Sequence, residues 1–389
     1  MQWWMILKRE MRQIFVKDPR LAVVIFGASI IYLVIFSLLY GTHVVNYVPL
    51  AIYDEDQSYI SRGLIQAFTD SEKFDIVVQP ATVDEMQQML QDHTVYAAVH
   101  IQRGFAKEIV SGRSSPVFFM TSGINLAITN TATTAAAEIV GAFSHSVSMK
   151  LAEKAGLKPS MADNKTAPVR VSLRVHGNPT LSYLYFFVIG LSMAAFQQAI
   201  FLPVGASIIG EYQRLHELAD NSALKIIGLK LLLYYLLDTL SFFLTLLMAV
   251  KVFAIPCRAD FFSILLLSTA FIFCAMGFSA VVSSLCDSEV TFSKLSLIYA
   301  VPAFTLSGYM WPFSSMDIFS QILSYFIPLT YFGDSLRDLL LSGHTPLLVR
   351  NVLLLYFTGV ALIGLAIAIF AYRRKQILSA ESIRVESVI

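Results

Sequence analysis

Few residues of this chain have the types and spacing that chemistry on a substrate requires. The three cysteines, Cys257, Cys274 and Cys286, form no CxxC pair, and their odd number argues against a disulfide framework. The motifs GxxxxGKS, GxxxxGKT, GxSxG and HExxH do not occur, and no cysteine–histidine cluster has zinc spacing. The sequence therefore predicts a chain that is not an enzyme by itself, has no metal site and binds no nucleotide through a P-loop.

Asp238 is an acidic residue inside a long apolar run, 226–250. It lies eight residues beyond Lys230, which corresponds to ~12 Å along a helix. At such a depth in a membrane a carboxylate costs several kcal/mol and usually marks a functional site. Two interpretations are open. The carboxyl is structural, protonated or bonded to a hydroxyl of a neighbouring helix, or it carries protons or binds a cationic substrate.

A polar stretch, 211–225, separates two apolar runs and has helical periodicity. A short amphipathic helix of this kind docks in a groove of a partner protein or lies on a membrane surface, and the pattern alone leaves both interpretations open. The apolar stripe consists of Tyr212, Leu215, Leu218 and Ala219, and the charged residues that face away from it are Glu211, Arg214, Glu217 and Asp220.

The elements that hold these residues are those of a membrane protein. The chain is 56% apolar and 14% charged, with a mean hydropathy of +0.65, whereas soluble domains have roughly 25% charged residues. Several uncharged runs reach the ~20 residues that a helix needs to cross a hydrocarbon core of ~30 Å. The formal net charge of +1 suggests no nucleic-acid partner.

We predict a polytopic α-helical membrane protein with six transmembrane helices and an α/β extracytoplasmic domain inserted between helices 1 and 2. An amphipathic helix over 1–20 is expected in the membrane interface, although an ordinary positive flank of the first span is the alternative. Lysine and arginine gather in the short loops of one side, so both termini are predicted to be cytoplasmic and residues 42–178 external. The other predicted parts are transmembrane helix 1 over 21–41, helices 2–6 within 179–375 (at 181–209, 226–250, 261–285, 295–311 and 349–372) and a cytoplasmic tail over 376–389.

The external domain, 42–178, alternates strand-like and helix-like segments, a pattern typical of an α/β fold with a small, largely parallel sheet. The predicted strands are 48–53, 74–78, 96–101 and 117–121, and the helices between them are 57–69, 83–91 and 103–110. A long Ala/Thr-rich helix over 124–158, a loop over 161–168 and a last strand over 169–175 complete the domain.

The apolar segment 312–341 is interrupted by prolines and glycine, so it predicts a re-entrant helix pair rather than a span. The motif Leu306-Ser307-Gly308-Tyr309-Met310-Trp311-Pro312 leads into it, and Pro328-Leu329-Thr330-Tyr331 with Asp334 and Arg337 lies within it. In this order the motifs resemble the ABC-2-type permease family, strongly over 181–372 and by architecture over 43–178. The motif residues with an expected structural role are Ser307, Gly308, Pro312, Pro328, Thr330, Tyr331 and Arg337.

The resemblance implies the permease subunit of an ATP-binding-cassette exporter, which moves a hydrophobic or amphiphilic substrate outward across the bacterial inner membrane. It implies a dimer with a second copy or a paralogue, contact with membrane lipids, and two separate cytoplasmic ATPase subunits. This chain holds no cofactor, because the ATPases bind ATP and Mg. The family pattern E-x-E-x-G-T-x-E-x-L corresponds to a coupling loop over 210–225, although this chain lacks its Gly-Thr. The expected coupling residues are Glu211, Tyr212, Arg214, Leu215, Glu217 and Leu218.

A substrate path between the subunits is also implied by the resemblance. Phe196, Gln197 and Gln198 near the middle of the second span are candidates for this path, together with Asp238; the alternative is that they face helices of the same subunit. The external domain is similar to those of exporters that work with a periplasmic adaptor. The alternative function is a membrane-anchored ligand-sensing or assembly protein, whose extracytoplasmic domain binds a ligand without transport.

Overall fold

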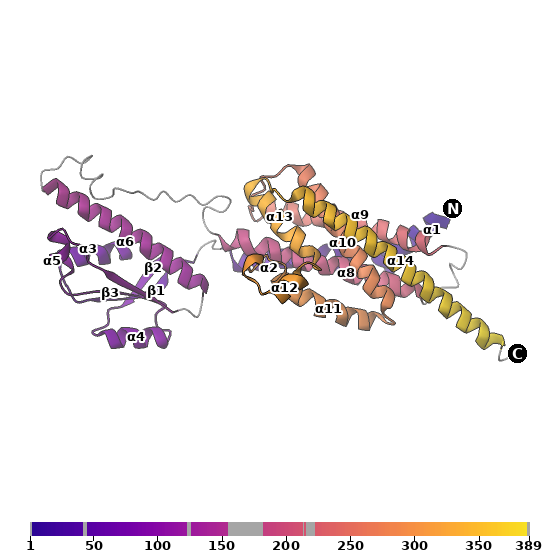
Figure 1. Ribbon diagram of the computed structural model, residues 1–389, viewed down its shortest axis with the longest axis horizontal. Coiled ribbons are helices and arrows are strands. Elements are labelled where there is room, and N and C mark those ends of the chain that lie inside the picture. Colours follow the sequence, from indigo (N-terminus) through magenta and orange to yellow (C-terminus); the bar gives the residue numbers. More distant parts are fainter. Residues whose placement is uncertain are drawn as a thin grey trace. The chain divides into compact units, whose positions relative to one another are not determined.

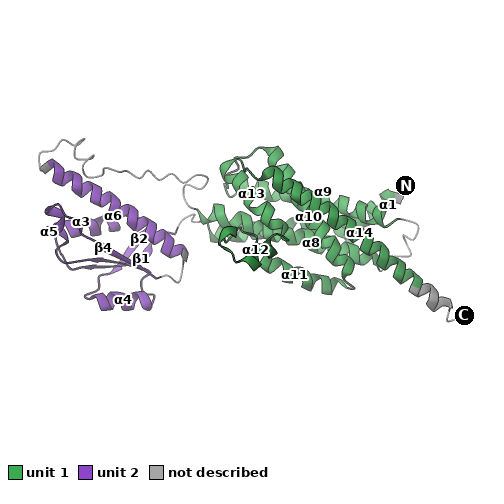
Figure 2. Ribbon diagram, viewed as in Figure 1, with its two compact units in different colours: residues 1–43, 175–389 green, residues 44–174 purple. Residues whose placement is uncertain are grey.

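A computed structural model describes residues 2–41, 45–122, 126–154, 182–212, 214 and 222–386 of the chain. The chain divides into two compact units (Figure 2). One is Val44–Arg174, and the other combines Met1–His43 with Val175–Ile389. The predicted loop 161–168 and strand 169–175 lie outside the described residues.

The smaller unit is an α/β fold around a four-stranded sheet with the order β2-β1-β3-β4. β1 (Val48–Asp54) is parallel to β2 (Phe74–Val78) and to β3 (Ala97–Ile101). β4 (Val117–Thr121) is antiparallel to β3 and forms an edge. The four strands therefore lie where the alternation of the sequence predicts them, and the sheet is largely parallel as expected.

Helices cover both faces of this sheet (Figure 1). Successive residues of a strand point to opposite faces, so Leu50 and Ile52 pack in one apolar cluster and Ala51 packs in another. The first cluster takes apolar residues from three helices, and the second takes Met86 from one helix on the opposite face. The helices are α3 (Tyr59–Thr69), α5 (Phe105–Val110) and α6 (Leu126–Lys154) on the first face and α4 (Val83–Gln91) on the second.

The larger unit is helical throughout its regular elements. Its first helix, α1 (Gln2–Arg12), continues as the π-helical turn η1 (Gln13–Lys17), and Pro19 begins α2 (Pro19–Leu39). Proline is tolerated there because the first turn of a helix needs no N–H donor. The further elements are η2 (Leu184–Val188), α8 (Ile189–Tyr212), α9 (Ala223–Lys251), α10 (Phe261–Leu285), α11 (Glu289–Leu306), η4 (Phe313–Ser315), α12 (Ile318–Ser324), α13 (Pro328–Ser342) and α14 (Leu348–Glu386).

Among the described residues, five helices are long and apolar enough to cross a membrane. They are Pro19–Leu39, Leu184–Tyr212, Ala223–Lys251, Phe261–Leu285 and Leu348–Ser379.

These five correspond to five of the six predicted spans. The remaining predicted span, 295–311, falls on α11, which is not among them, so the count of six stays a prediction. α11 ends at Leu306 rather than at residue 311, because Gly308 takes a φ of +83° that a helix cannot continue. α14 continues to Glu386, so the segment predicted as a tail begins as a continuation of this helix.

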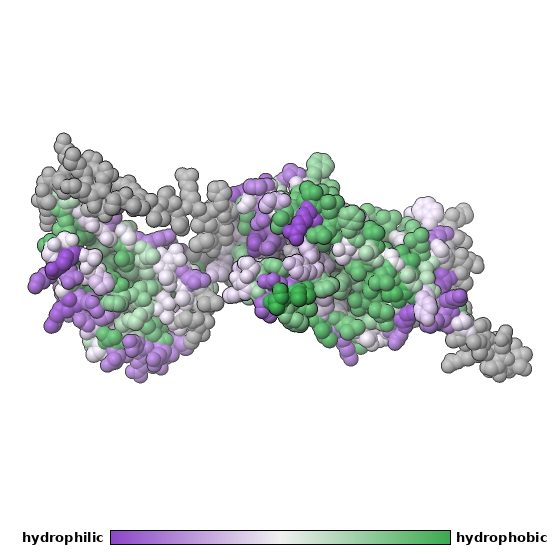
Figure 3. Space-filling view, in the orientation of Figure 1, coloured by the Kyte–Doolittle hydropathy of each residue, from purple (hydrophilic) through white to green (hydrophobic). Residues whose placement is uncertain are grey.

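The helices α8 and α10 form the centre of the larger unit. In their most apolar stretches 72% and 67% of the residues are buried, against 22% in α2 and in α14. Apolar residues cover the visible middle of this unit (Figure 3), which is the surface that a lipid environment accommodates. Glycines let neighbours approach α8 closely, since a Cβ at Gly190 would lie 2.3 Å from Tyr309 and one at Gly205 would lie 2.1 Å from Phe292.

The helix pair predicted over 312–341 is present as α12 and α13. Thr330 Oγ1 donates a hydrogen bond to the Ser324 carbonyl oxygen at 2.8 Å, which joins the two helices. Asn351 of α14 donates to the Tyr331 carbonyl oxygen at 3.1 Å and to Ser335 Oγ at 2.8 Å, which attaches α13 to α14. Whether the pair enters a membrane from one side stays a prediction.

Candidate functional site

The predicted coupling segment begins at the end of α8, where Glu211 and Tyr212 are its last two residues. Arg214 is described just beyond them, in a turn whose backbone N–H donates to the Glu211 carbonyl oxygen at 3.0 Å. The other predicted coupling residues, Leu215, Glu217 and Leu218, lie outside the described residues. The structure therefore describes how the segment is anchored at its start.

Glu211 is anchored by buried ionic contacts. Its side chain is 4% exposed and pairs with the Lys230 ammonium at 2.8 Å and with the Arg9 guanidinium. Lys230 Nζ also lies 3.0 Å from Glu10 Oε2 and donates to Ser207 Oγ at 2.9 Å. Two cations thus face two carboxylates in one place. We call this group the Lys230 cluster; it consists of Arg9, Glu10, Ser207, Glu211, Lys230 and Tyr234.

The Lys230 cluster joins three helices that are far apart in the sequence. Arg9 and Glu10 come from α1, Ser207 and Glu211 from α8, and Lys230 from α9. The hydroxyl of Tyr234, also on α9, donates to Glu10 Oε1 at 3.2 Å. Burial of charges costs several kcal/mol for each ion and is offset only when every ion is paired and hydrogen-bonded. The cluster therefore holds these three helices in one specific arrangement.

Glu10 is charged in this arrangement. Burial acts to raise the pKa of its carboxyl, but the charge of Lys230 and the hydrogen bonds from Ser207 and Lys230 outweigh burial, so the pKa lies below its ordinary value of 4.5. On α1, Glu10 lies between Ile6 and Ile14 on the buried side of the helix, whereas Trp3 and Trp4 are exposed. An acidic residue on the buried face of a short helix needs a cation opposite it, which Lys230 provides.

Tyr212 is anchored in a different group of helices. Its hydroxyl donates to the Ser284 carbonyl oxygen at 3.1 Å, and its ring lies 5.0 Å from that of Phe370. The Arg373 guanidinium lies over the Tyr212 ring at 4.9 Å. This Arg373 cluster consists of Tyr212, Ser284, Cys286, Asp287, Phe370 and Arg373.

Arg373 also closes the end of α10. It donates to the carbonyl oxygens of Ser284 at 2.7 Å and Cys286 at 3.1 Å and pairs with Asp287. The last carbonyl groups of a helix have no partner within the helix and carry partial negative charge, so a cation is favoured there. The side chain therefore joins α14, α10 and the start of the coupling segment.

The sequence reasoning missed most residues of both clusters. Lys230 is buried, with an exposed fraction of 3%, although its position suggests a loop charge. Its presence inside an apolar run, four residues before Tyr234, is a signal that an acidic partner must lie opposite it. Nothing local in the sequence identifies Glu10 as that partner, because the two residues are 220 positions apart.

The residues predicted to line a substrate path lie between helices of this chain. Phe196 is fully buried, with its ring 5.7 Å from Phe242 and 6.4 Å from Phe271. Gln198 exchanges hydrogen bonds with Ser296 of α11, at 3.0 Å to the carbonyl oxygen and 2.7 Å from the hydroxyl. These contacts are all made within this chain.

Gln197 is also buried between these helices, with an exposed fraction of 2%. A substrate path past Phe196, Gln197 and Gln198 stays a prediction.

Asp238 is fully buried in α9. Neither of its oxygen atoms has a hydrogen-bond partner among the described residues. On the same buried side of α9, Ser241 Oγ donates to the Ile25 carbonyl oxygen at 2.5 Å, so the neighbouring polar groups are satisfied by α2. One interpretation expects the Asp238 carboxyl to bond to a hydroxyl of a neighbouring helix. The described residues provide no such hydroxyl partner.

The motif residues around α13 surround Tyr309. Arg337 lies over the rings of Phe186 at 5.2 Å and Tyr309 at 4.9 Å, and it pairs with Asp334 at 2.7 Å. The Tyr309 hydroxyl donates to the Phe186 carbonyl oxygen at 2.6 Å. This arrangement connects α13 with the start of the η2–α8 helix.

The other motif residues act on the backbone. Ser307 caps α11 and donates to the Phe304 carbonyl oxygen at 2.7 Å, and Gly308 supplies the positive φ that follows. Pro312 precedes η4, and Pro328 occupies the first position of α13. Tyr331 donates to the Tyr325 carbonyl oxygen at 3.1 Å.

No metal centre is formed by the part of the chain that the structure describes. Within it, no three histidine, cysteine, aspartate or glutamate side chains are grouped so that they could hold an ion. The contacts at the end of α8 are ion pairs, hydrogen bonds and ring contacts that join this helix to α1, α9, α10 and α14.

Comparisons with known proteins identify the family of this chain. The sequence model of the family described as "ABC-2 family transporter protein" matches residues 20–368. The chain is 21% identical over 384 residues to the probable multidrug ABC transporter permease YbhR of Escherichia coli (strain K12), covering 96% of this chain and 98% of that protein. It is 31% identical over 138 residues to the probable multidrug ABC transporter permease YbhS of the same organism, covering 35% of this chain and only 37% of that protein.

A third relative is the ABC transporter G family member 20 of Dictyostelium discoideum, which is 25% identical over 178 residues. That match covers 44% of this chain and 24% of that protein. The family match extends across α2, the α/β unit and all the helices from α8 into α14. The chain belongs to the ABC-2 family of transporter proteins.

Proposed function

We propose that this chain is the permease subunit of an ATP-binding-cassette exporter. It moves a hydrophobic or amphiphilic substrate outward across the bacterial inner membrane, and a separate ATPase subunit supplies the energy. Two relatives are named as probable multidrug ABC transporter permeases, and the chain itself has no P-loop motif. The observation that carries the proposal is that the start of the predicted coupling segment, at the end of α8, is anchored to two different groups of helices. We call this arrangement the double anchor.

The double anchor supplies a route for coupling. Glu211 connects the start of the segment to α1 and α9, and Tyr212 connects it to α10 and α14. An ATPase that docks on the segment and closes on ATP would therefore displace both helix groups at once. Because buried charge pairs and packed rings have a few discrete arrangements, a small displacement of the loop is converted into a shift of whole helices.

The proposed arrangement in the membrane has six spans, with α11 as the fifth, and both termini in the cytoplasm. α1 lies in the membrane interface, where the exposed Trp3 and Trp4 reach the headgroup layer. The α/β unit is then external. The partners are a second permease copy or paralogue, membrane lipids, two ATPase subunits that bind ATP and Mg, and a periplasmic adaptor.

The test is purification of the tagged chain from its native membrane, followed by assay of ATP hydrolysis and ATP-driven transport. A co-purifying P-loop ATPase, with transport abolished by substitution of its P-loop lysine, is the expected result. A membrane-anchored sensor or assembly protein is the alternative function, and it predicts no dependence on ATP. Purification without any ATPase, in a complex that responds to ligand alone, would favour that alternative.

A further inference from the structure

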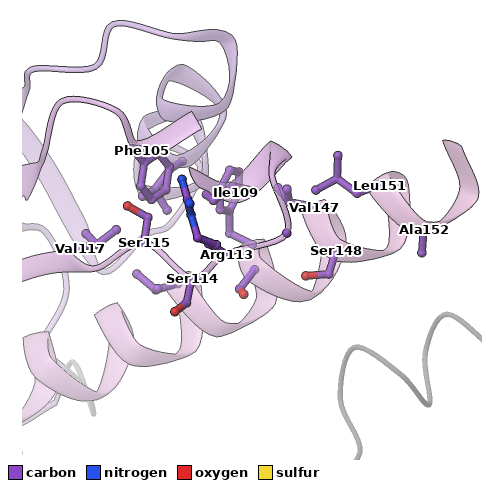
Figure 4. Close-up of a pocket in the computed structure, with 15 residues that line it drawn as sticks. Phe105, Ile109, Arg113, Ser114, Ser115, Val117, Val147, Ser148, Leu151 and Ala152 are labelled. Carbon is purple, nitrogen blue, oxygen red and sulfur yellow. The ribbon is translucent and has the colours of Figure 1, made fainter. Parts of the chain in front are cut away.

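The α/β unit contains a cavity that the transport proposal does not use. It has a volume of about 640 Å³ and lies between α5, the start of β4 and α6 (Figure 4). Sites for small molecules typically have volumes of ~300–1,000 Å³, so this cavity is large enough for one.

Apolar side chains form the long wall of this cavity. Val140, Phe143, Val147 and Leu151 of α6 follow one another at intervals of three or four residues and therefore lie on one side of the helix. Opposite them, the cavity reaches the buried Phe105. A wall of this kind, about three helical turns long, suits an extended hydrocarbon chain.

One end of the cavity is polar and positively charged, in contrast to its apolar wall. Among the described residues, Arg113 is the only charged residue that lines it, and no acidic residue does. Its guanidinium makes no ion pair or hydrogen bond with another described residue. Figure 4 shows its nitrogen atoms toward the Phe105 end of the cavity. Four serines, Ser114, Ser115, Ser144 and Ser148, also line the cavity. A guanidinium with serine hydroxyls beside it is a favourable set of donors for an anionic group.

We propose that this cavity binds a single-chain amphiphile with one anionic head group. The chain lies along the apolar stripe of α6, and the head group accepts hydrogen bonds from Arg113 and the neighbouring serines. A cationic amphiphile is disfavoured because it would face Arg113 without an acidic partner. This binding site belongs to the α/β unit alone, so it requires neither ATP nor the helical unit.

The experiment uses the full chain in nanodiscs of zwitterionic lipid, with dodecanoate that carries a diazirine as the probe. After photolysis, mass spectrometry identifies the labelled peptides. Label is expected in 105–117 and 140–152. Arg113→Gln is expected to raise the dodecanoate concentration that gives half-maximal labelling roughly tenfold, which is the effect of losing one charge-assisted hydrogen bond. Arg103→Gln removes the same charge from an exposed site outside the cavity and should leave the value unchanged.

Two further measurements separate the parts of the proposal. A probe with the same chain and an alcohol head group should bind more weakly and should not distinguish Arg113→Gln from the original chain. Val147→Glu should weaken both probes, because it places a charge in the apolar wall. The proposal is overturned if dodecanoate labels the Arg113→Gln variant with unchanged affinity, if label appears only in the membrane helices, or if phosphatidylglycerol competes and unlabelled dodecanoate does not.

Discussion

Glu211 and Tyr212 are adjacent at the end of α8, yet their side chains bind two different groups of helices. The Glu211 carboxylate pairs with Arg9 of α1 and Lys230 of α9. The Tyr212 hydroxyl and ring contact Ser284 of α10 and Arg373 of α14. Since side chains of neighbouring helical residues point about 100° apart, this is the geometry in which one loop can act on both groups. The proposed coupling role depends on this relationship.

Lys230→Met should destabilise the helical unit. The substitution keeps the length of the side chain but leaves the carboxylates of Glu10 and Glu211 buried without Lys230, and breaking a buried pair costs about 3–5 kcal/mol. We expect a clearly lower thermal unfolding midpoint in detergent. Lys251→Met at the exposed end of the same helix is the matched control and should change the midpoint little. Equal midpoints for the two variants would show that the cluster does not stabilise the fold.

The Lys230 cluster should also make stability depend on pH. The folded state lowers the pKa of Glu10 below 4.5, so its stabilisation is present above that value and is lost as pH falls through the lower folded pKa. The difference in unfolding midpoint between the original chain and Glu10→Gln should therefore be largest near neutral pH and shrink below pH 4.5. A difference that stayed constant down to the most acidic condition would contradict the charged state of Glu10.

Arg373→Gln should impair coupling more than folding. The variant loses the cation over Tyr212 and the charge at the end of α10, while most packing remains. With the ATPase present, we expect ATP hydrolysis to continue and transport per ATP to fall several-fold. Lys375→Gln, an exposed cation two residues further along α14, serves as the control. Parallel loss of both activities in Arg373→Gln would instead indicate failed assembly.

Gly190→Ala should disturb the contact between α8 and Tyr309. The new Cβ would lie 2.3 Å from the ring, so the ring or the helix must move, at a cost of about 1–3 kcal/mol. The thermal unfolding midpoint in detergent measures this loss of stability. Adding Tyr309→Leu to the Gly190→Ala chain should restore part of the stability. Gly228→Ala, where the new Cβ would meet no packed neighbour within 4 Å, should stabilise or be neutral. An unchanged midpoint for Gly190→Ala would refute the close contact.

Asp238→Leu tests whether the buried carboxyl serves stability or transport. Neither oxygen has a hydrogen-bond partner among the described residues, so replacement by an apolar residue of similar size should stabilise by about 1–3 kcal/mol. Asp238→Asn keeps the shape and removes the ability to ionise. Loss of transport in both variants, at normal expression and raised stability, would assign Asp238 to the transport process. Full transport in both would assign it no role there.

The sequence by itself determined the identity and position of most elements. Apolar runs of ~20 residues predict helices, because a helix satisfies its own backbone hydrogen bonds in lipid, and five of these runs correspond to helices in the structure. Short apolar segments that alternate with helix-like segments located the four strands that the structure describes in the α/β unit, because strands buried on both faces are short apolar runs in the sequence. The end of α11 was predicted five residues too late, since Gly308 ends a helix through a backbone angle that hydropathy does not report.

The tertiary structure decided which polar residues meet. Lys230 and Glu10 are 220 positions apart. Lys230 stands in an apolar run and Glu10 stands among basic residues of the first helix, so neither sequence neighbourhood identifies the other residue as its partner. The same applies to Arg373, which looks like the positive stop of a span but lies over Tyr212 and closes α10. Hydropathy reports how each segment interacts with its solvent, whereas ion pairs depend on which helix faces pack together. The packing of the faces is set by the shapes of the glycine, tyrosine and phenylalanine residues at the contacts of α8 and α10.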